Sequence, residues 1–268
     1  MRLYVIAAYL FLYIPIGIIA LFSFNAGRHA AQFTGFSVQW YGKALDNPFV
    51  IDALKTSFTV ALASAVLATL CGTLAAVALQ GIRGRMRMVY DALIYMAVMV
   101  PGIVIGIATL IALVTVFDVL NPLLASLFGG EAPPQLGLGK GSLIAAHGLF
   151  TMALVIVIVR ARLQGMDRTL LEAAADLGAP PLRSFVQITL PQIAPAVLAG
   201  FLLAFTFSFD DFIVAFFVAG SETTLPIYVF SSIRRGVTPE INAIGTMVMA
   251  ASLVVLITAQ LILRPRKR

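Results

Sequence analysis

The stretch 160–195 reads RARLQGMDRTLLEAAADLGAPPLRSFVQITLPQIAP and lies as a polar, charged segment between two long apolar runs. From Leu163 to Leu177, apolar side chains recur with the spacing of one helix face. Gly178 follows where a helix C-cap glycine belongs, and the two prolines after Ala179 prevent the helix from continuing. The stretch therefore predicts an amphipathic helix that ends at a glycine corner.

A second short helix is expected from Pro181 to Ile188, and Pro191 marks the entry to the next apolar run. Two short helices that meet at a glycine corner form a rigid knob. Apolar side chains such as Leu182 and Phe185 would be partly exposed on this knob. The pattern indicates that the knob docks into another protein.

The composition is that of a polytopic membrane protein. Of 268 residues, 60% are hydrophobic and 11% are charged, and the mean hydropathy is +1.00. A soluble domain is about half apolar and about a quarter charged. The 18 basic residues outnumber the 12 acidic ones, but they are scattered in short loops without an aromatic-interleaved basic face, which argues against nucleic acid binding. The lone Cys71 forms no intrachain disulfide and is interpreted as a packing residue.

Six stretches approach or exceed the roughly 20 apolar residues that a helix needs to cross the hydrocarbon core. The first is too long for the apolar part of a secretion signal and is kept as a span. We therefore expect an all-α membrane protein, with residues 1–268 forming a single transmembrane domain of six helices. The predicted spans are Leu3–Ser23, Ser57–Leu79, Ala92–Phe117, Leu143–Val159, Ile193–Ala219 and Ala243–Leu263.

The basic residues orient these spans. With both termini inside, 12 basic residues lie on the cytoplasmic side and six lie in the longer outer loops, so the positive-inside rule favours the N-in, C-in topology. The loop 160–192 is then cytoplasmic, and the polar segment Asn25–Thr56 lies outside, partly as an interfacial helix. The inner residues are Arg2, Arg83, Arg85, Arg87, Arg160, Arg162, Arg168, Arg183, Arg264, Arg266, Lys267 and Arg268.

The cytoplasmic loop carries every fixed position of a known signature. The pattern E-A-A-x3-G-x9-I-x-L-P is present with the right spacing, and on these residues the chain resembles the permease subunits of bacterial ABC importers. The matching residues are Glu172, Ala173, Ala174, Gly178, Ile188, Leu190 and Pro191.

The resemblance implies a type I ABC importer permease in the bacterial inner membrane. The loop would be the coupling helix that sits in a groove of a cytoplasmic ATPase, so that nucleotide-driven closure of the ATPase dimer switches the pore between its inward- and outward-facing states. One chain with six spans would be half of a pore, which implies a second permease subunit, as a heterodimer, and an extracytoplasmic binding protein. The ATPase-coupling candidates are Glu172, Ala173, Ala174, Gly178, Leu190 and Pro191.

The resemblance also implies that this chain is not an enzyme and holds no cofactor or metal, since ATP and Mg²⁺ belong to the partner ATPase. The stretch GLGKGS at 137–142 departs from a phosphate-binding loop. Pro134 occupies a required glycine position, and Gly141 replaces the Ser or Thr after Lys140.

Two further stretches narrow the resemblance. SFDDFIVAFFVAG at 208–220 and the segment 223–244 are similar to the spermidine/putrescine branch of these permeases, as are LYIP at 12–15, FSFN at 22–25 and WY at 40–41. This implies ATP-driven import of polyamines. Relatives that import aminoethylphosphonate, opines or other small solutes share much of the pattern, so another small solute stays open.

Asp210 and Asp211 lie in the outer half of the fifth predicted span. An aspartate at the centre of a membrane helix costs about 2.5–3.5 kcal/mol, so both should face the bundle interior or water. Adjacent residues of a helix point about 100° apart, so one carboxylate can face the pore while the other turns to a neighbouring helix. Phe205 and Phe216 belong to an aromatic stripe of the same span. The substrate-pathway candidates are Asp210, Asp211, Phe209 and Phe212.

The alternative for these aspartates is structural: both would cap or pair with groups on other helices. Three other features are interpreted conservatively. Pro101, Gly102 and Gly106 predict a kink and a packing face, His147 is expected to be hydrogen-bonded within the bundle, and 228–237 is an outer amphipathic segment suited to a binding protein or to lipid headgroups.

Two other function classes fit the sequence less well than the importer does. A stand-alone secondary transporter or channel is compatible with six spans and intramembrane acids, but it needs no segment that matches an ATPase groove. An intramembrane enzyme lacks a metal or nucleophile constellation, since the two His and one Cys stand on separate elements.

Overall fold

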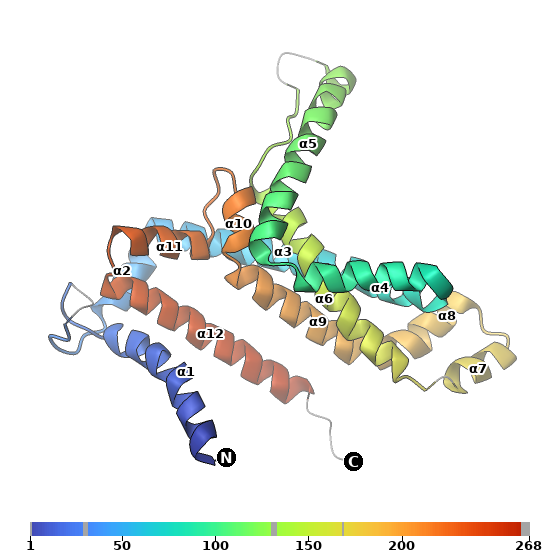
Figure 1. Ribbon diagram of the computed structural model, residues 1–268, viewed down its shortest axis with the longest axis horizontal. Coiled ribbons are helices and arrows are strands. Elements are labelled where there is room, and N and C mark those ends of the chain that lie inside the picture. Colours follow the sequence, from blue (N-terminus) through green and yellow to red (C-terminus); the bar gives the residue numbers. More distant parts are fainter. Residues whose placement is uncertain (1, 29–31, 130–132, 168, 264–268) are drawn as a thin grey trace. The chain divides into compact units, whose positions relative to one another are not determined.

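The computed structural model describes residues 2–28, 32–129, 133–167 and 169–263, and this part of the chain is helical without a regular strand (Figure 1). An isolated antiparallel bridge joins Asn25 and Phe36. The predicted cytoplasmic residues Arg168, Arg264, Arg266, Lys267 and Arg268 lie outside the described residues. The elements are α1 (Arg2–Phe22), α2 (Gln39–Asp46), α3 (Pro48–Ala78), η1 (Leu79–Gly81), α4 (Gly84–Met99), α5 (Gly102–Phe128), α6 (Lys140–Gln164), α7 (Thr169–Asp176), α8 (Pro181–Ser184), η2 (Phe185–Thr189), α9 (Leu190–Asp210), α10 (Ile213–Val218), α11 (Leu225–Arg235) and α12 (Pro239–Leu263).

Five of these helical segments are long and apolar enough to cross a membrane: Tyr4–Phe22, Pro48–Gly81, Gly102–Phe128, Lys140–Gln164 and Pro181–Asp210. A sixth apolar segment, Pro239–Val254, is shorter and belongs to α12. The chain falls into two compact units, one made of Met1–Lys55 with Leu225–Arg268 and the other of Thr56–Thr224.

In the first unit, the loop after α1 folds back onto α2 and its flanking residues. The indole N–H of Trp40 donates to the carbonyl of Asn25 at 2.8 Å, and the hydroxyls of Ser23 and Tyr41 lie 2.6 Å apart. The side-chain oxygen of Asn25 accepts the backbone N–H of Thr34 at 2.9 Å. These bonds satisfy polar groups that are buried in this part of the unit. Helix α2 lies in the segment that was expected to hold an interfacial helix.

A second polar cluster in this unit joins the corner between α2 and α3 to the helices near the C-terminus. The side-chain amide of Asn47 donates to the carboxylate of Glu240 at 3.0 Å and to the hydroxyl of Tyr228 at 3.2 Å. Asn47 thereby connects α11 and α12 to the start of α3.

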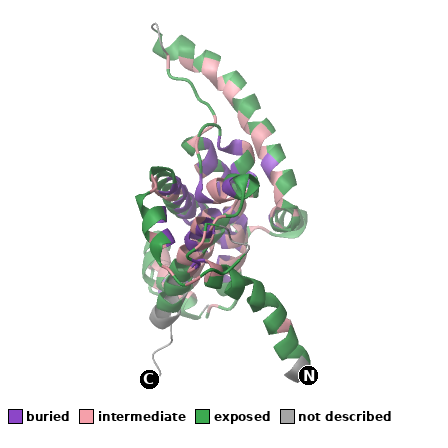
Figure 2. Cartoon of the chain, turned by 90° about the vertical axis from the view of Figure 1, so that its left-hand side faces the viewer, coloured by how far each residue is buried: buried purple, intermediate pink, exposed green. Residues whose placement is uncertain are grey.

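In the second unit, α3, α6 and α9 pack around a core of small and β-branched side chains. Buried residues are drawn in purple in Figure 2. A methyl group placed on Gly72 would lie 3.0 Å from the side chain of Val155, and one on Gly200 would lie 3.3 Å from it. Glycines at such positions allow the helix backbones to approach closely, as is common in membrane bundles. By contrast, the apolar side chains of α5 are largely exposed.

The expected third span, Ala92–Phe117, is wrong as a single helix. It breaks between α4 and α5, because Pro101 lacks a backbone N–H and the preceding Val100 is extended, with ψ 132°. The glycines after the break form the predicted packing face. A methyl group on Gly106 would lie 2.6 Å from the ring of Phe217, and Gly102 faces Ile213. This face receives α10.

The expected fifth span, Ile193–Ala219, is also wrong as a continuous helix. At its start, α8, η2 and α9 form one helical path, so Pro191 lies within it rather than opening a new helix. At its end, α9 stops at Asp210 and the backbone of Asp211 is extended, with φ −70° and ψ 121°. The path resumes in α10, and the aromatic stripe is divided between the two helices.

Candidate functional site

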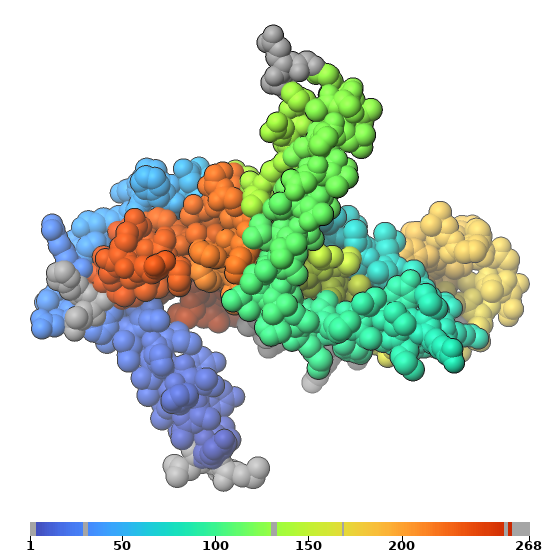
Figure 3. Space-filling view, turned by 45° about the horizontal axis from the view of Figure 1, so that its top comes forward, coloured from blue at the N-terminus to red at the C-terminus, as the bar shows by residue number. Residues whose placement is uncertain are grey.

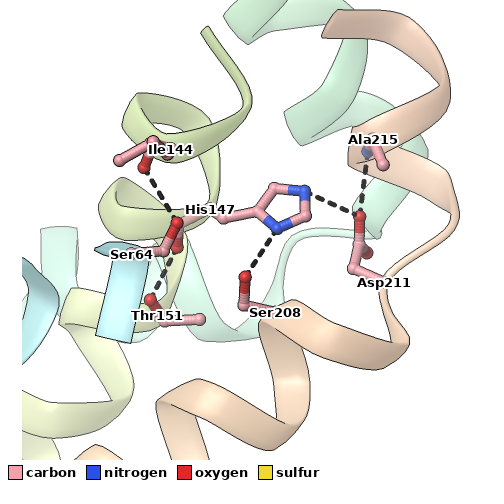
Figure 4. A network of polar contacts seen from close by, with 7 residues as sticks. All are labelled: Ser64, Ile144, His147, Thr151, Ser208, Asp211 and Ala215. Atoms are coloured by element: carbon pink, nitrogen blue, oxygen red, sulfur yellow. Dashed lines mark hydrogen bonds and ion pairs between the residues drawn. The ribbon is translucent and has the colours of Figure 1, made fainter. Parts of the chain in front are cut away.

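The break between α9 and α10 places Asp211 in a polar network inside the second unit (Figure 4). One carboxylate oxygen of Asp211 accepts the backbone N–H of Ala215 at 2.9 Å. The same oxygen lies 3.5 Å from Nε2 of His147, and the Asp211 side chain is only 16% exposed. Since 3.5 Å is longer than an ordinary hydrogen bond, this second contact is an electrostatic one.

His147 comes from the N-terminal half of α6, and its side chain is almost completely buried. Its Nδ1 lies 2.8 Å from the hydroxyl of Ser208, one turn before Asp211, while Nε2 is directed toward the carboxylate (Figure 4). The arrangement fits a ring that carries its proton on Nε2 and accepts the Ser208 hydroxyl proton at Nδ1. The hydroxyl of Thr151 donates to the His147 carbonyl at 2.6 Å, which fixes this turn of α6.

Both ends of α10 are fixed. At its start, the Asp211 carboxylate accepts one of the backbone N–H groups that a first helical turn leaves unpaired. At its end, the hydroxyl of Ser142 donates to the carbonyl of Val218 at 2.7 Å. Gly220 then turns the chain with φ +59°, where a side chain would collide with the carbonyl of Leu138. Asp211 thus helps to position the short helix α10.

Asp210 has a different environment. It is the last residue of α9, its side chain is exposed, and among the described residues it has no hydrogen bond or ion pair. Phe207 and Thr206, three and four positions earlier, are also exposed and belong to the same helix face. This uncovered face with one carboxylate is available to a ligand or to another subunit.

The two candidate phenylalanines are in aromatic pairs. Phe209 stacks on Phe205 with ring centroids 5.9 Å apart, and Phe205 meets the edge of Phe58 on α3. Phe212 pairs with Phe216 at 5.5 Å. The structure therefore brings Phe209 into helix packing and keeps Phe212 beside α10.

The coupling segment has the expected glycine corner, which confirms Gly178 as a helix terminator. Gly178 has φ +70°, and its N–H donates to the carbonyl of Ala175 at 2.9 Å. The N–H of Ala179 reaches back to Ala174 at 3.0 Å, which completes a Schellman motif. Before α7, hydrogen bonds from Thr169 lower the pKa of the Asp167 carboxyl.

The coupling candidates differ in exposure. Ala174 is buried and Leu190 is half-buried, so both support the shape of the segment. The exposed apolar side chains beside the corner are prominent, with Leu177 87% and Leu182 75% exposed. The surface of α7 and α8 is uncovered in Figure 3, where it is drawn in gold. The candidates that lie exposed are Glu172, Ala173, Gly178 and Pro191.

Ser208 was not among the sequence candidates. The sequence could have indicated Ser208 because it is a polar residue in an apolar run, three positions before Asp211. Only the structure shows that His147 contacts it. The described residues contain no group of three His, Cys, Asp or Glu side chains that could hold a metal ion.

The two aspartates should differ in their effect on stability. Asp211→Ala removes the acceptor for Ala215 and leaves a buried histidine without its carboxylate. The free energy of unfolding should fall by about 1–3 kcal/mol. Asp210→Ala should leave it almost unchanged, because the side chain is exposed and unpaired. Thermal unfolding of the two purified variants measures this, and equal losses would contradict the assignment.

Comparisons with known proteins agree with this architecture. Residues 68–268 match the family model "Binding-protein-dependent transport system inner membrane component". The chain is 38% identical over 263 residues to the spermidine/putrescine transport system permease protein PotC of Escherichia coli (strain K12), which covers 98% of this chain and 93% of the relative. It is 39% identical over 244 residues to the putrescine transport system permease protein PotI of the same organism, covering 90% of this chain and 82% of the relative.

Solved structures show the same fold at low identity. A bacterial ABC transporter involved in the import of the acidic polysaccharide alginate matches with a TM-score of 0.76 and 16% identity, covering 100% of this chain and 95% of that one. The MetNI methionine ABC transporter matches with a TM-score of 0.60 and 14% identity, covering 81% and 96%. The type I importer permease fold follows from these structures and the family match. The multi-pass inner-membrane location follows from the family match and the relatives. The chain belongs to the family of binding-protein-dependent transport system inner membrane components, the permease subunits of ABC importers.

Proposed function

We propose that this permease forms half of a pore that imports polyamines such as spermidine and putrescine. The names of the relatives at 38–39% identity support this substrate class. The observation that carries the proposal is the exposed, unpaired carboxylate of Asp210 beside exposed Phe207. A polyamine alternates ammonium groups with methylene stretches, so a carboxylate next to an aromatic ring suits it chemically.

Asp210 and Asp211 have separate roles in this proposal. Asp210 contacts the substrate weakly and briefly, because tight binding would slow its release. Asp211 holds α10 and the adjoining turn of α9 through Ala215 and His147. Phe209 maintains the face on which Asp210 lies by stacking on Phe205, and Phe212 keeps its proposed place along the substrate pathway.

The remaining components are separate chains in the proposal. A dimer of cytoplasmic ATPase subunits binds ATP with Mg²⁺ and carries out hydrolysis, so this chain is not itself an enzyme. A second permease subunit completes the pore as a heterodimer, and an extracytoplasmic binding protein delivers the solute. The exposed apolar side chains of α5 suit a second membrane-embedded helix bundle.

The ATPase contact is proposed for the knob formed by α7 and α8. Glu172 and Ala173 lie exposed before the Gly178 corner, and the apolar side chains of Leu177 and Leu182 flank it. Burying such side chains in a groove yields roughly 25 cal/mol per Å² of apolar surface. Pro191 and Leu190 sit where the knob passes through η2 into α9, so movement of the knob reaches Asp210 along one helical path.

The substrate role of Asp210 is tested by Asp210→Asn in the complete importer, reconstituted with its binding protein loaded with spermidine or putrescine. Loss of the charge should lower uptake roughly tenfold, which corresponds to 1.4 kcal/mol, with normal yield of the assembled complex. Asp210→Glu should retain more uptake than Asp210→Asn. Asp52→Asn, at an exposed carboxylate beside Lys55, is the matched control. Normal uptake in an assembled Asp210→Asn complex would rule out the assignment.

The coupling role of the knob is tested at Gly178. A non-glycine residue with positive φ costs about 1–2 kcal/mol, and asparagine tolerates that conformation best. No atom lies within 4 Å of the added methyl position, so backbone strain rather than crowding decides the result within this chain. Gly178→Val should reduce the amount of solute imported per ATP hydrolysed, while Gly178→Asn should retain most of it. If both variants couple as the natural protein does, the corner plays no part in coupling.

A further inference from the structure

A charged pair joins α4 to the cytoplasmic part of α6. A guanidinium nitrogen of Arg160 lies 2.5 Å from a carboxylate oxygen of Asp91. The side chain of Arg160 is 16% exposed and that of Asp91 is 31% exposed. A partly buried guanidinium–carboxylate hydrogen bond is considerably stronger than an exposed ion pair, because water screens it less.

A second arginine is a weaker partner of the same carboxylate. Arg87 lies 3.8 Å from Asp91, and half of its side chain is exposed. An open pocket of about 60 Å³ adjoins both arginines. The side chain of Arg87 is 51% exposed and that of Arg160 is 16% exposed, so solvent reaches Arg87 more easily. Arg87 and Asp91 both belong to α4, so their contact lies within one helix, whereas Arg160–Asp91 is the charged contact that joins α4 to α6. The pocket is lined by Leu79, Gln80, Arg87, Arg160, Leu163 and Gln164.

The pair lies at the base of the knob. Arg160 and Arg162 belong to the last part of α6, which leads into α7. The guanidinium of Arg162 donates to the carbonyl of Gln192 near the start of α9 at 3.0 Å. The end of α6 is thus joined to α9 by Arg162 and to α4 by Arg160.

From α4, a continuous series of contacts leads to the acidic pair. The chain turns at Pro101 into α5, and Gly102 and Gly106 on α5 receive Ile213 and Phe217 of α10. The carboxylate that begins α10 is Asp211, which also faces His147. The knob is therefore connected to this site directly through α6, at His147 and Ser142, and through α9. A further route runs through α4, α5 and α10.

We propose that Arg160 and Asp91 are positioning residues that transmit movement of the knob to α4 and, through α5 and α10, to the acidic pair. The proposal rests on the proposed ATPase-driven import. Without the pair, α6 and α9 still follow the knob, but α4 and α5 do not follow with them. Helix α10 is held by α6 at His147 and Ser142 and by α5 at Gly102 and Gly106. Its two supports then move out of step, and ATP is hydrolysed without productive movement at the site.

A double-mutant cycle in the complete importer tests this. Asp91→Ala, Arg160→Ala and the double variant are compared for solute imported per ATP hydrolysed, with Arg87→Ala as the matched control. In each single variant, the amount of solute imported per ATP hydrolysed should fall at least about fivefold, which is the lower end of typical coupling between sites. The double variant should lose no more than either single one, because the two residues act as a unit. Arg87→Ala should lose less than twofold.

A second readout needs no substrate. With Cys71→Ser as background, spin labels are attached through Gln187→Cys on η2, next to the knob, and Phe216→Cys on α10, both exposed side chains. Trapping the ATPase with ATP and vanadate should change the distance between the two labels when Arg160 and Asp91 are both present. This change should be at least twofold smaller in Asp91→Ala and in Arg160→Ala. The swap Asp91→Arg with Arg160→Asp should restore it.

Losses that add up in the double variant, or an unchanged distance response in Arg160→Ala, would overturn the proposal. If the swapped variant does not assemble, the double variant Asp91→Glu with Arg160→Lys is used in its place. A change in label distance no larger than that of the single variants would then contradict the role of Arg160 and Asp91. If instead the natural complex imports no polyamine but still shows the distance change, the proposed substrate is wrong and the transmission stands.

Discussion

A carboxylate in an apolar helix bundle needs donors nearby, and Asp211 meets this need by ending a helix. A continuous helix offers its side chains no free backbone N–H groups, whereas a break exposes the first ones of the next turn. The Asp211 carboxylate accepts the N–H of Ala215 and faces His147 across 3.5 Å. The two-helix form of this region, α9 followed by α10, depends on that arrangement.

The position of α10 in turn depends on small residues. Gly106 allows the ring of Phe217 to approach α5, and Gly220 allows the chain to turn under the carbonyl of Leu138. The Ser142 hydroxyl holds the far end of α10. Because α10 is fixed at both ends and packed on α5, it can respond as a body to movement of α4 and α5. The transmission proposed for Arg160 and Asp91 needs such a rigid element.

Much of this architecture could be predicted from local pattern. Span composition indicated a polytopic helical protein, and the amphipathic run before Gly178 indicated a helix that ends at a positive-φ glycine, which the backbone confirms. The packing role of Gly102 and Gly106 also followed from their spacing, although their partner on α10 could not be named in advance.

The helix breaks and the polar contacts could not be predicted in the same way. A run of apolar residues has the same composition whether or not its helix is interrupted, so the end of α9 at Asp210 was missed. At Pro101 the sequence indicated a kink, but not the full break after Met99. Hydrophobicity also does not reveal which distant side chains meet. The contact of His147 with Ser208 joins residues 61 positions apart, and the Arg160–Asp91 pair joins residues 69 apart. Such pairings depend on helix packing rather than on local spacing.

The most direct test of the division between the two aspartates is an experimental structure of the assembled importer with a polyamine in the pore, at a resolution that shows side chains. We expect a substrate ammonium within hydrogen-bonding distance of the Asp210 carboxylate. Asp211 should still accept the N–H of Ala215, and the chain should leave the helical path between α9 and α10. An ammonium bound to Asp211 instead, or a continuous helix through residues 193–219, would contradict the account.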